Sequence, residues 1–194
     1  MRYVLWLVLL VNSLLLVACK TAPVNDSTTS QSAAKPDRRT PDIIANDRAI
    51  EHAAHEELAD NQELIGRSHI NVHAYNGLAL LTGEVPNEAV KTNVLDIVRV
   101  IPQVKMVRDS LVVAQPINST TRANDVQLTA QVNAALQQIH TLPNFDPAMV
   151  KVVTENGIVY LMGQVSREEG NVVINLTRLQ PNVKQIITVF EYLD

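Results

Sequence analysis

The chain has 194 residues and carries 16 Lys or Arg against 20 Asp or Glu, which gives a formal net charge of −4 at pH 7. A mildly acidic chain with 4% aromatic residues lacks the basic surface and stacking side chains of nucleic-acid-binding proteins, so we expect no nucleic-acid partner. The single cysteine excludes an intramolecular disulfide and a thiolate metal cluster. The length suffices for one medium-sized core or two small ones.

The first residues have the pattern of an export signal. Arg2 precedes two apolar stretches, and the interruption at Asn12-Ser13 leaves both short for a membrane-spanning helix, which needs about 20 residues. We therefore predict a cleaved signal peptide over residues 1–18. The alternative is an ordinary signal, or a short anchor helix, with an incidental cysteine.

Cys19 ends a tetrapeptide, Leu16-Val17-Ala18-Cys19, that resembles the bacterial lipobox. The resemblance implies cleavage before Cys19 and acylation of its thiol and amine, and each buried CH₂ would strengthen the attachment by about 0.8 kcal/mol. The next residue is Lys20 and not Asp. In the bacterial sorting rule that this position resembles, Asp after the cysteine retains a lipoprotein at the inner membrane. Lys20 therefore implies a lipid-anchored protein of the outer membrane that faces the periplasm.

Residues 19–43 form the predicted lipid anchor and tether. Their Thr, Ser, Ala, Pro and charged residues show no apolar periodicity, so we expect a disordered segment. About two dozen such residues give an r.m.s. reach of roughly 25–30 Å. That reach would let a small domain stand off a lipid surface or lie on it.

One stretch of the chain occurs twice, and each copy predicts a β-hairpin. The copies are residues 70–85, INVHAYNGLALLTGEV, and residues 150–165, VKVVTENGIVYLMGQV. Asn76-Gly77 and Asn156-Gly157 lie between β-branched and apolar residues, and an Asn-Gly pair tolerates the positive φ angles of a type I′ turn. That turn fixes the register, so position 75 should pair with 78 and position 70 with 83.

Helical patterns flank each hairpin. Asp47 and Asp125, each in an Ala-Asn-Asp tripeptide, are predicted to cap the first helix of their copy. A second helix, ended by a proline, is predicted at 87–101 and at 167–179, and a strand follows it. The order α-β-β-α-β, twice, predicts an α+β fold in which each copy has a three-stranded mixed sheet with two helices on one face.

These elements divide the folded part into a first module, residues 44–113, a linker, residues 114–122, and a second module, residues 123–194. Gly83 and Gly163 lie on the helix-facing side of their predicted strands. A glycine inside a strand usually marks a bulge or a close backbone approach. We expect a helix to pack tightly on the sheet at both glycines.

The pattern of each module resembles the BON domain: a helix preceded by Asp, an Asn-Gly turn, L-x-G-x-V, a second helix and a final strand. The segments INVHAYNG, VKVVTENG and LMGQV make the resemblance specific. A lipobox followed by two such modules is similar, over the whole chain, to the dual-BON outer-membrane lipoproteins. That resemblance implies a non-enzymatic lipoprotein that binds anionic phospholipid through its second module, concentrates at division sites, and supports envelope integrity and outer-membrane assembly.

In that family the lipid-contacting surface is placed around the first helix of the second module, here Asp125 to Gln137. A helix that dips into a membrane favours an aromatic anchor and basic neighbours, whereas the exposed positions predicted here are mostly amides. We therefore expect weaker lipid contact there, or contact through another edge. The candidate lipid-contacting residues are Arg122, Val126, Gln127, Gln131 and Asn133.

The sheet face turned away from the helices is apolar in both copies. Such a face is polar when it meets water, so an apolar one implies a partner. We favour packing of the two modules on each other. The alternative is an interaction scaffold that contacts outer-membrane assembly machinery through these faces. The residues concerned are Tyr75, Leu78, Leu80, Val153, Ile158, Tyr160 and Met162.

The sequence contains no motif for catalysis. Ser68 lacks the G-x-S-x-G elbow, and no phosphate-binding loop is present. His52 and His55 on a predicted helix supply at most two ligands, whereas catalytic zinc needs three, and we expect His69 and His73 on a predicted strand to be solvated. We expect no enzyme activity, cofactor, bound metal or small-molecule substrate, and a metal-dependent periplasmic enzyme is the weakest alternative.

Overall fold

The structure is a computed structural model that describes residues 37–193. The predicted signal peptide, the predicted acylation site Cys19 and most of the predicted tether lie outside these residues. Within them the chain forms the predicted order α-β-β-α-β twice. No helix in this described part is both long enough and apolar enough to cross a lipid bilayer.

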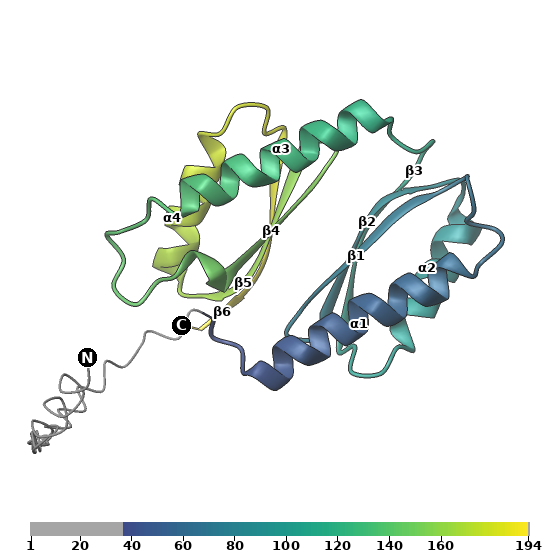
Figure 1. Ribbon diagram of the computed structural model, residues 1–194, viewed down its shortest axis with the longest axis horizontal. Helices are drawn as coiled ribbons and strands as arrows, with labels where there is room; N and C mark the ends of the chain where they lie inside the picture. Colours follow the sequence, from purple (N-terminus) through teal and green to yellow (C-terminus); the bar gives the residue numbers. More distant parts are fainter. Residues whose placement is uncertain (1–36, 194) are drawn as a thin grey trace, which may run out of the picture. The chain divides into compact units, whose positions relative to one another are not determined.

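The two modules have equivalent elements (Figure 1). The first module contains α1 (Pro41–Ala59), β1 (His69–Tyr75), β2 (Leu78–Val85), α2 (Glu88–Arg99) and β3 (Met106–Val113). The second contains α3 (Ser119–Leu136), the 3₁₀ helix η1 (Pro147–Met149), β4 (Val150–Glu155), β5 (Ile158–Val165), α4 (Arg167–Arg178) and β6 (Gln185–Tyr192).

Each module contains a three-stranded mixed sheet, as predicted. β2 lies between β1, to which it is antiparallel, and β3, to which it is parallel, and β5 has the same place between β4 and β6. The predicted register is confirmed, because Tyr75 pairs with Leu78 and Ile70 with Gly83. Both hairpins turn on an Asn-Gly pair with positive φ, 52° and 80° in the first and 48° and 77° in the second, as a type I′ turn requires.

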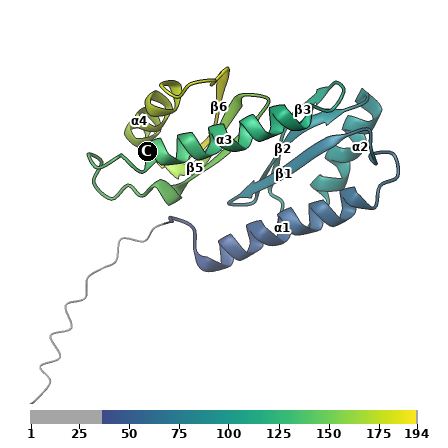
Figure 2. The ribbon, with the colours of Figure 1, turned by 45° about the horizontal axis from the view of Figure 1, so that its top comes forward.

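The two sheets lie between two layers of helices (Figures 1 and 2). Helices α1 and α2 pack on the first sheet around a buried cluster that includes Ile50 and Leu81. Helices α3 and α4 pack on the second sheet around Val132 and Leu161. A third buried cluster contains residues of strands alone, from β1 and β2 of the first sheet and from β4, β5 and β6 of the second. The helix-free faces of the two sheets therefore pack on each other.

The prediction that Asp47 and Asp125 cap the first helix of each module is wrong. The caps are Thr40 and Asn118, whose side chains accept hydrogen bonds from the first turn of α1 and of α3. Thr and Asn are good capping residues too, and a proline directly after Thr40 favours a helix that starts there. The two helices therefore extend into the segments predicted as the tether and the linker.

The close approach predicted at Gly83 and Gly163 exists, but none of the helices α1 to α4 makes it: the approaching backbone is that of His69, the first residue of β1, and of Met149, the last residue of η1 directly before β4. A Cβ atom on Gly83 would lie 1.9 Å from the backbone oxygen of His69, and one on Gly163 would lie 2.6 Å from that of Met149. The missing side chain therefore lets the start of one hairpin strand cross close to its partner. Gly83 also has a φ of +112°, which L-residues rarely adopt.

Candidate functional site

The repeated Asp of each module holds the hairpin turn and not the helix end. The Asp47 carboxylate accepts hydrogen bonds from the backbone nitrogens of Asn76 and Gly77, both at 2.8 Å. Asp125 repeats this arrangement on the second turn at 2.8 and 2.7 Å. Both aspartates are nearly buried, 3% and 7% exposed, so each satisfies two donors that the turn leaves unpaired.

A lysine completes each turn from the other side. Lys105 Nζ donates to the backbone oxygen of Asn76 at 3.2 Å, and Lys184 Nζ donates to that of Asn156 at 2.8 Å. Neither lysine was predicted from the sequence, although the nearly equal separations from the Asn-Gly pairs, 29 residues from Asn76 to Lys105 and 28 from Asn156 to Lys184, were a usable signal. The Asp-turn-Lys arrangement has a structural role, because it holds a backbone turn from both sides.

The apolar sheet faces meet in one cluster that spans both modules. All seven residues predicted for an inter-module or partner face lie in it or against it, together with Ile187 and Val189 of β6, which the sequence analysis did not include. Leu80 and Met162 are 0% exposed. These faces are therefore covered and do not offer the free surface on which the predicted interaction scaffold depends.

Polar contacts at this junction are reciprocal. The Tyr75 hydroxyl donates to the backbone oxygen of Met149 at 3.0 Å and accepts from the backbone nitrogen of Gln164 at 3.3 Å. Equivalent positions of the two copies are 80 residues apart, as Asn76 and Asn156 show. Tyr75 is therefore equivalent to Glu155. Its two partners, Met149 and Gln164, are equivalent to His69 and Glu84.

Glu155 makes the matching contact on the other side of the junction. Its carboxylate lies 3.5 Å from His69 Nδ1, and the Glu84 carboxylate lies 3.6 Å from the same atom. Contacts that repeat with the partners exchanged are the mark of an approximate two-fold relation between the modules. One half of this pair is a neutral tyrosine bonded to backbone, and the other is a cluster of three ionisable side chains.

The His69, Glu84 and Glu155 cluster is buried. Glu84 is 4% and Glu155 6% exposed. The Glu155 carboxylate accepts from the Asn71 side-chain amide at 2.9 Å and from the Thr82 hydroxyl at 3.3 Å. Burial raises the pKa of Glu155, which the Asn71 hydrogen bond and the His69 charge partly oppose.

The prediction that His69 and His73 are solvated is wrong. His69 Nδ1 is buried, and burial together with nearby Lys151 lowers the pKa of His73 to about 4, against the opposing charge of Glu51. His73 therefore stays neutral at pH 7. Lys151 of β4 forms an ion pair with Glu51 of α1, a second charged link between the modules.

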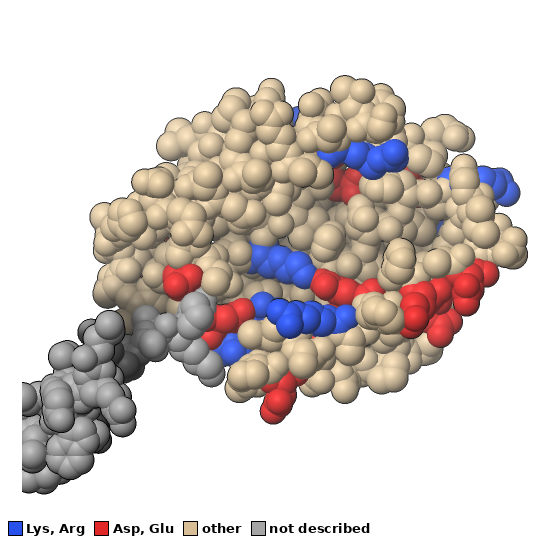
Figure 3. All heavy atoms as spheres, in the orientation of Figure 1, with Lys and Arg blue, Asp and Glu red and all other residues tan. Residues whose placement is uncertain are grey.

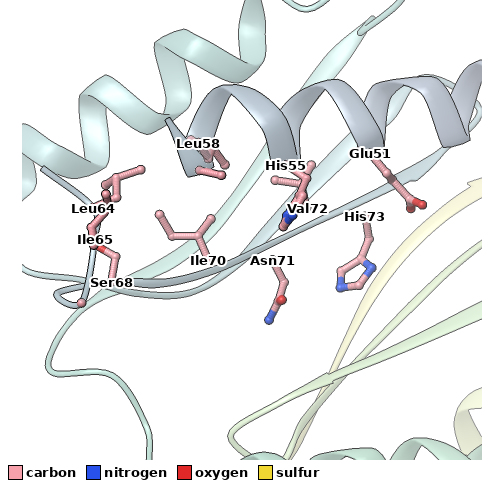
Figure 4. Close-up of a pocket in the computed structure, with 12 residues that line it drawn as sticks. Glu51, His55, Leu58, Leu64, Ile65, Ser68, Ile70, Asn71, Val72 and His73 are labelled. Carbon is pink, nitrogen blue, oxygen red and sulfur yellow. The ribbon is translucent and has the colours of Figure 1, made fainter. Parts of the chain in front are cut away.

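A surface hollow of about 370 Å³ opens along the free edge of β1, between α1 and the turn that follows it. Figure 4 shows that Asn71 and His73 point away from α1, whereas Ile70 and Val72 point to the other side of the strand. The hollow is lined by side chains of mixed character, and of its two histidines His55 lies on the exposed side of α1.

The predicted lipid-contacting residues lie together on or just beside the exposed side of α3. Arg122, Val126, Gln127 and Asn133 are exposed and Gln131 is half-buried. Val126 is 72% exposed, unusually high for an apolar side chain. In Figure 3 the surface over α3 is largely uncharged, whereas acidic side chains gather over the later part of α1.

The first described residues bind to the second module. Arg38 donates to the backbone oxygen of Gln164 at 2.6 Å and pairs with both carboxylate oxygens of Glu169 at 2.7 and 2.8 Å. The hydrogen bond from Arg38 lowers the pKa of Glu169. Glu169 also closes the capping box of α4 with Ser166. The segment that enters the folded unit is thereby fixed to the start of α4.

The fold and the junction define a protein of two similar α+β modules, docked through their sheets, with helices on the outside. The sequence pattern of the BON domain matches residues 46–115 and 124–194, so the chain belongs to the BON domain family. It has two BON domains and is DolP-like, as the sequence resemblance predicted. It is 28% identical over 187 residues to the outer membrane lipoprotein DolP of Haemophilus influenzae, covering 96% of this chain and 95% of that one.

Two other kinds of relative were found. The chain is 25% identical over 159 residues to a protein named 21 kDa hemolysin from Actinobacillus pleuropneumoniae, covering 81% of this chain and 79% of that protein. Among solved structures, CdsD, a structural protein of the type III secretion system of Chlamydia trachomatis, matches at 15% identity and a TM-score of 0.31, covering 75% of this chain and 91% of that one. At that level of similarity it does not bear on the function of this chain.

Proposed function

We propose that this chain is an outer-membrane lipoprotein, acylated at Cys19 and facing the periplasm, which acts without catalysis. Its second BON module contacts anionic phospholipid, and through that contact it supports envelope integrity at the division site. The name of the DolP relative, an outer membrane lipoprotein similar over nearly the whole chain, supports the location. Cys19 at the end of a lipobox-like tetrapeptide, followed by Lys20, supports the attachment.

The observation that carries the lipid contact is the exposed pair Arg122 and Val126, one turn apart on α3. An apolar side chain beside a basic one can enter the headgroup region while the guanidinium meets a phosphate. Gln127 and Asn133 add amide donors on the exposed side of the same helix. Arg38 also supports lipid contact by the second module, because it fixes the segment that precedes α1 to that module.

The contact of α3 with lipid is weak by itself. Only one basic and one apolar side chain contribute, and the surface over α3 is largely uncharged in Figure 3. Covalent attachment compensates, because it turns the second contact into an intramolecular one at high effective concentration. The lipid anchor therefore keeps the protein at the membrane, and α3 gives the preference for anionic headgroups.

Vesicle co-sedimentation tests this proposal. The chain without its signal and Cys19 should sediment with phosphatidylglycerol vesicles more than with phosphatidylcholine vesicles. Val126→Asp and Arg122→Glu should each reduce the phosphatidylglycerol-bound fraction, since one places a charge in the headgroup region and the other reverses the attraction. Val100→Asp is the matched control, because Val100 is 79% exposed on the first module.

Two results would contradict the proposal. One is equal sedimentation with both lipids. The other is a loss of vesicle binding in Val100→Asp as large as that in Val126→Asp. That result would mean that any exposed valine contributes to binding and that α3 is not the lipid-contacting surface.

A further inference from the structure

We propose that His69, Glu84 and Glu155 bind one divalent transition-metal ion, with Zn²⁺ as its probe, and that this ion bridges the two modules. His69 and Glu84 lie opposite each other on β1 and β2 of the first module. Glu155 ends β4 of the second module. The three donor atoms lie within 4.8 Å of one another.

The distances suit a metal ion better than direct hydrogen bonds. The two contacts to His69 Nδ1, at 3.5 and 3.6 Å, exceed the normal N–H···O distance. A tetrahedral ion with bonds of about 2.0–2.2 Å separates its ligand atoms by about 3.3–3.6 Å. One imidazole and two carboxylates, with water in the fourth position, form a usual set for such an ion.

The two buried carboxylates of the cluster favour binding of a cation. Glu84 and Glu155 are both nearly buried, and within residues 37–193 the only ion-pair partner of either carboxylate is His69. His69 Nδ1 is itself buried and has no hydrogen-bond partner in the described part of the chain, although it faces both carboxylates. A divalent ion would pair with all three groups at once.

The cluster has room for water beside the ion. Glu84 and Glu155 both line a cavity of about 160 Å³, which is bounded by the chain after β3 and by the second hairpin. Liquid water occupies about 30 Å³ per molecule, so the cavity can supply the remaining ligand. It also gives a path by which an ion can reach the two carboxylates.

The repeat shows that the fold itself does not require these charges. At the equivalent position of the first module, Tyr75 closes the junction with neutral hydrogen bonds to the backbone of Met149 and Gln164. At this position the junction is thus closed by a neutral side chain, with the Arg39 guanidinium 3.8 Å from the centre of its ring. The second half instead places three potential ligands together, which favours a function for them beyond packing.

Calorimetric titration of the full-length chain, purified in detergent and stripped with a chelator, tests the site. Zn²⁺ should bind with one-to-one stoichiometry and raise the unfolding temperature, whereas Mg²⁺, which rarely takes imidazole, should do neither. Glu155→Gln and His69→Ala should each weaken Zn²⁺ binding about tenfold or more. His52→Ala is the matched control, because His52 is exposed on α1 and should leave the affinity unchanged.

Three results would overturn the proposal. Absence of Zn²⁺ binding would mean that the three side chains pack together without an ion. Binding that survives Glu155→Gln, or binding that His52→Ala removes, would place the ion elsewhere. If His69→Ala does not fold, Glu84→Gln and Glu155→Gln carry the test, because they remove charge at nearly constant shape, and far-UV circular dichroism checks their folding.

Discussion

Asp125 shows how a single side chain holds a module together. Its carboxylate accepts two backbone hydrogen bonds from the Asn156-Gly157 turn inside the protein. Two buried N–H groups without acceptors each cost about 1–3 kcal/mol, more than the bonds are worth on the surface. Turn geometry and helix position therefore depend on one residue, and Asp47 has the same part in the first module.

Asp125→Ala should lower the free energy of unfolding by about 3 kcal/mol, because it leaves those two donors unpaired. Urea unfolding followed by circular dichroism measures the change. Asp96→Ala is the control, since Asp96 is exposed on α2 and pairs with exposed Arg99, and it should change the stability by no more than about 0.5 kcal/mol. Equal losses in the two variants would refute the turn-holding role.

Glu169 makes stability depend on pH. Its pKa is lowered from the ordinary value of 4.5, chiefly by the hydrogen bond from Arg38. A depressed pKa in the folded state means that the carboxylate stabilises the protein above pH 4.5 and that this contribution is lost as the pH falls through the folded-state pKa.

Glu169→Gln removes the charge and keeps the capping box, because Gln serves at that position as well as Glu. The variant should be less stable than the native chain at neutral pH, and the difference should shrink as the pH falls below 4.5. Thermal unfolding across that range measures it. A difference that is the same at every pH would mean that the Arg38 ion pair does not contribute.

At the scale of elements, the hairpins were predictable and the helix starts were not. An Asn-Gly turn allows one register, so Ile70 had to oppose Gly83 once the turn was identified. A helix start has no such constraint, because Asp47, Thr40 and the residues between them offer competing starts. The aspartates were recognised as important but were assigned the wrong partner, since their true partners lie on a distant turn.

The glycines inside β2 and β5 allow another backbone segment to approach these strands closely. Gly83→Ala should destabilise the first module by about 3–5 kcal/mol, because the new methyl group would overlap the His69 carbonyl at a φ that alanine resists. Gly66→Ala is the matched control, with a φ of +70° but no atom within 4 Å of the added methyl group. It should cost only about 1–2 kcal/mol. A Gly83→Ala variant no less stable than Gly66→Ala would contradict the close strand crossing.

At the scale of the molecule, the two sheets cover each other and leave the helices outside. The apolar outer faces were visible in the sequence, but the partner that covers them was left open between a second module and another protein. The ionisable cluster was not predicted, because His69 and Glu155 are 86 residues apart in the chain and meet only across the junction.

Carbodiimide cross-linking tests the junction most directly, since it joins a lysine to a carboxylate only where the two are in contact. Docking of the two modules predicts a covalent link between Lys151 of the second module and Glu51 of the first, which form an ion pair and are each 30% exposed. Lys91 and Asp109, paired at 2.9 Å within the first module, give the internal standard. Peptide mass spectrometry that finds the Lys91–Asp109 link and no Lys151–Glu51 link would contradict the docking of the two modules.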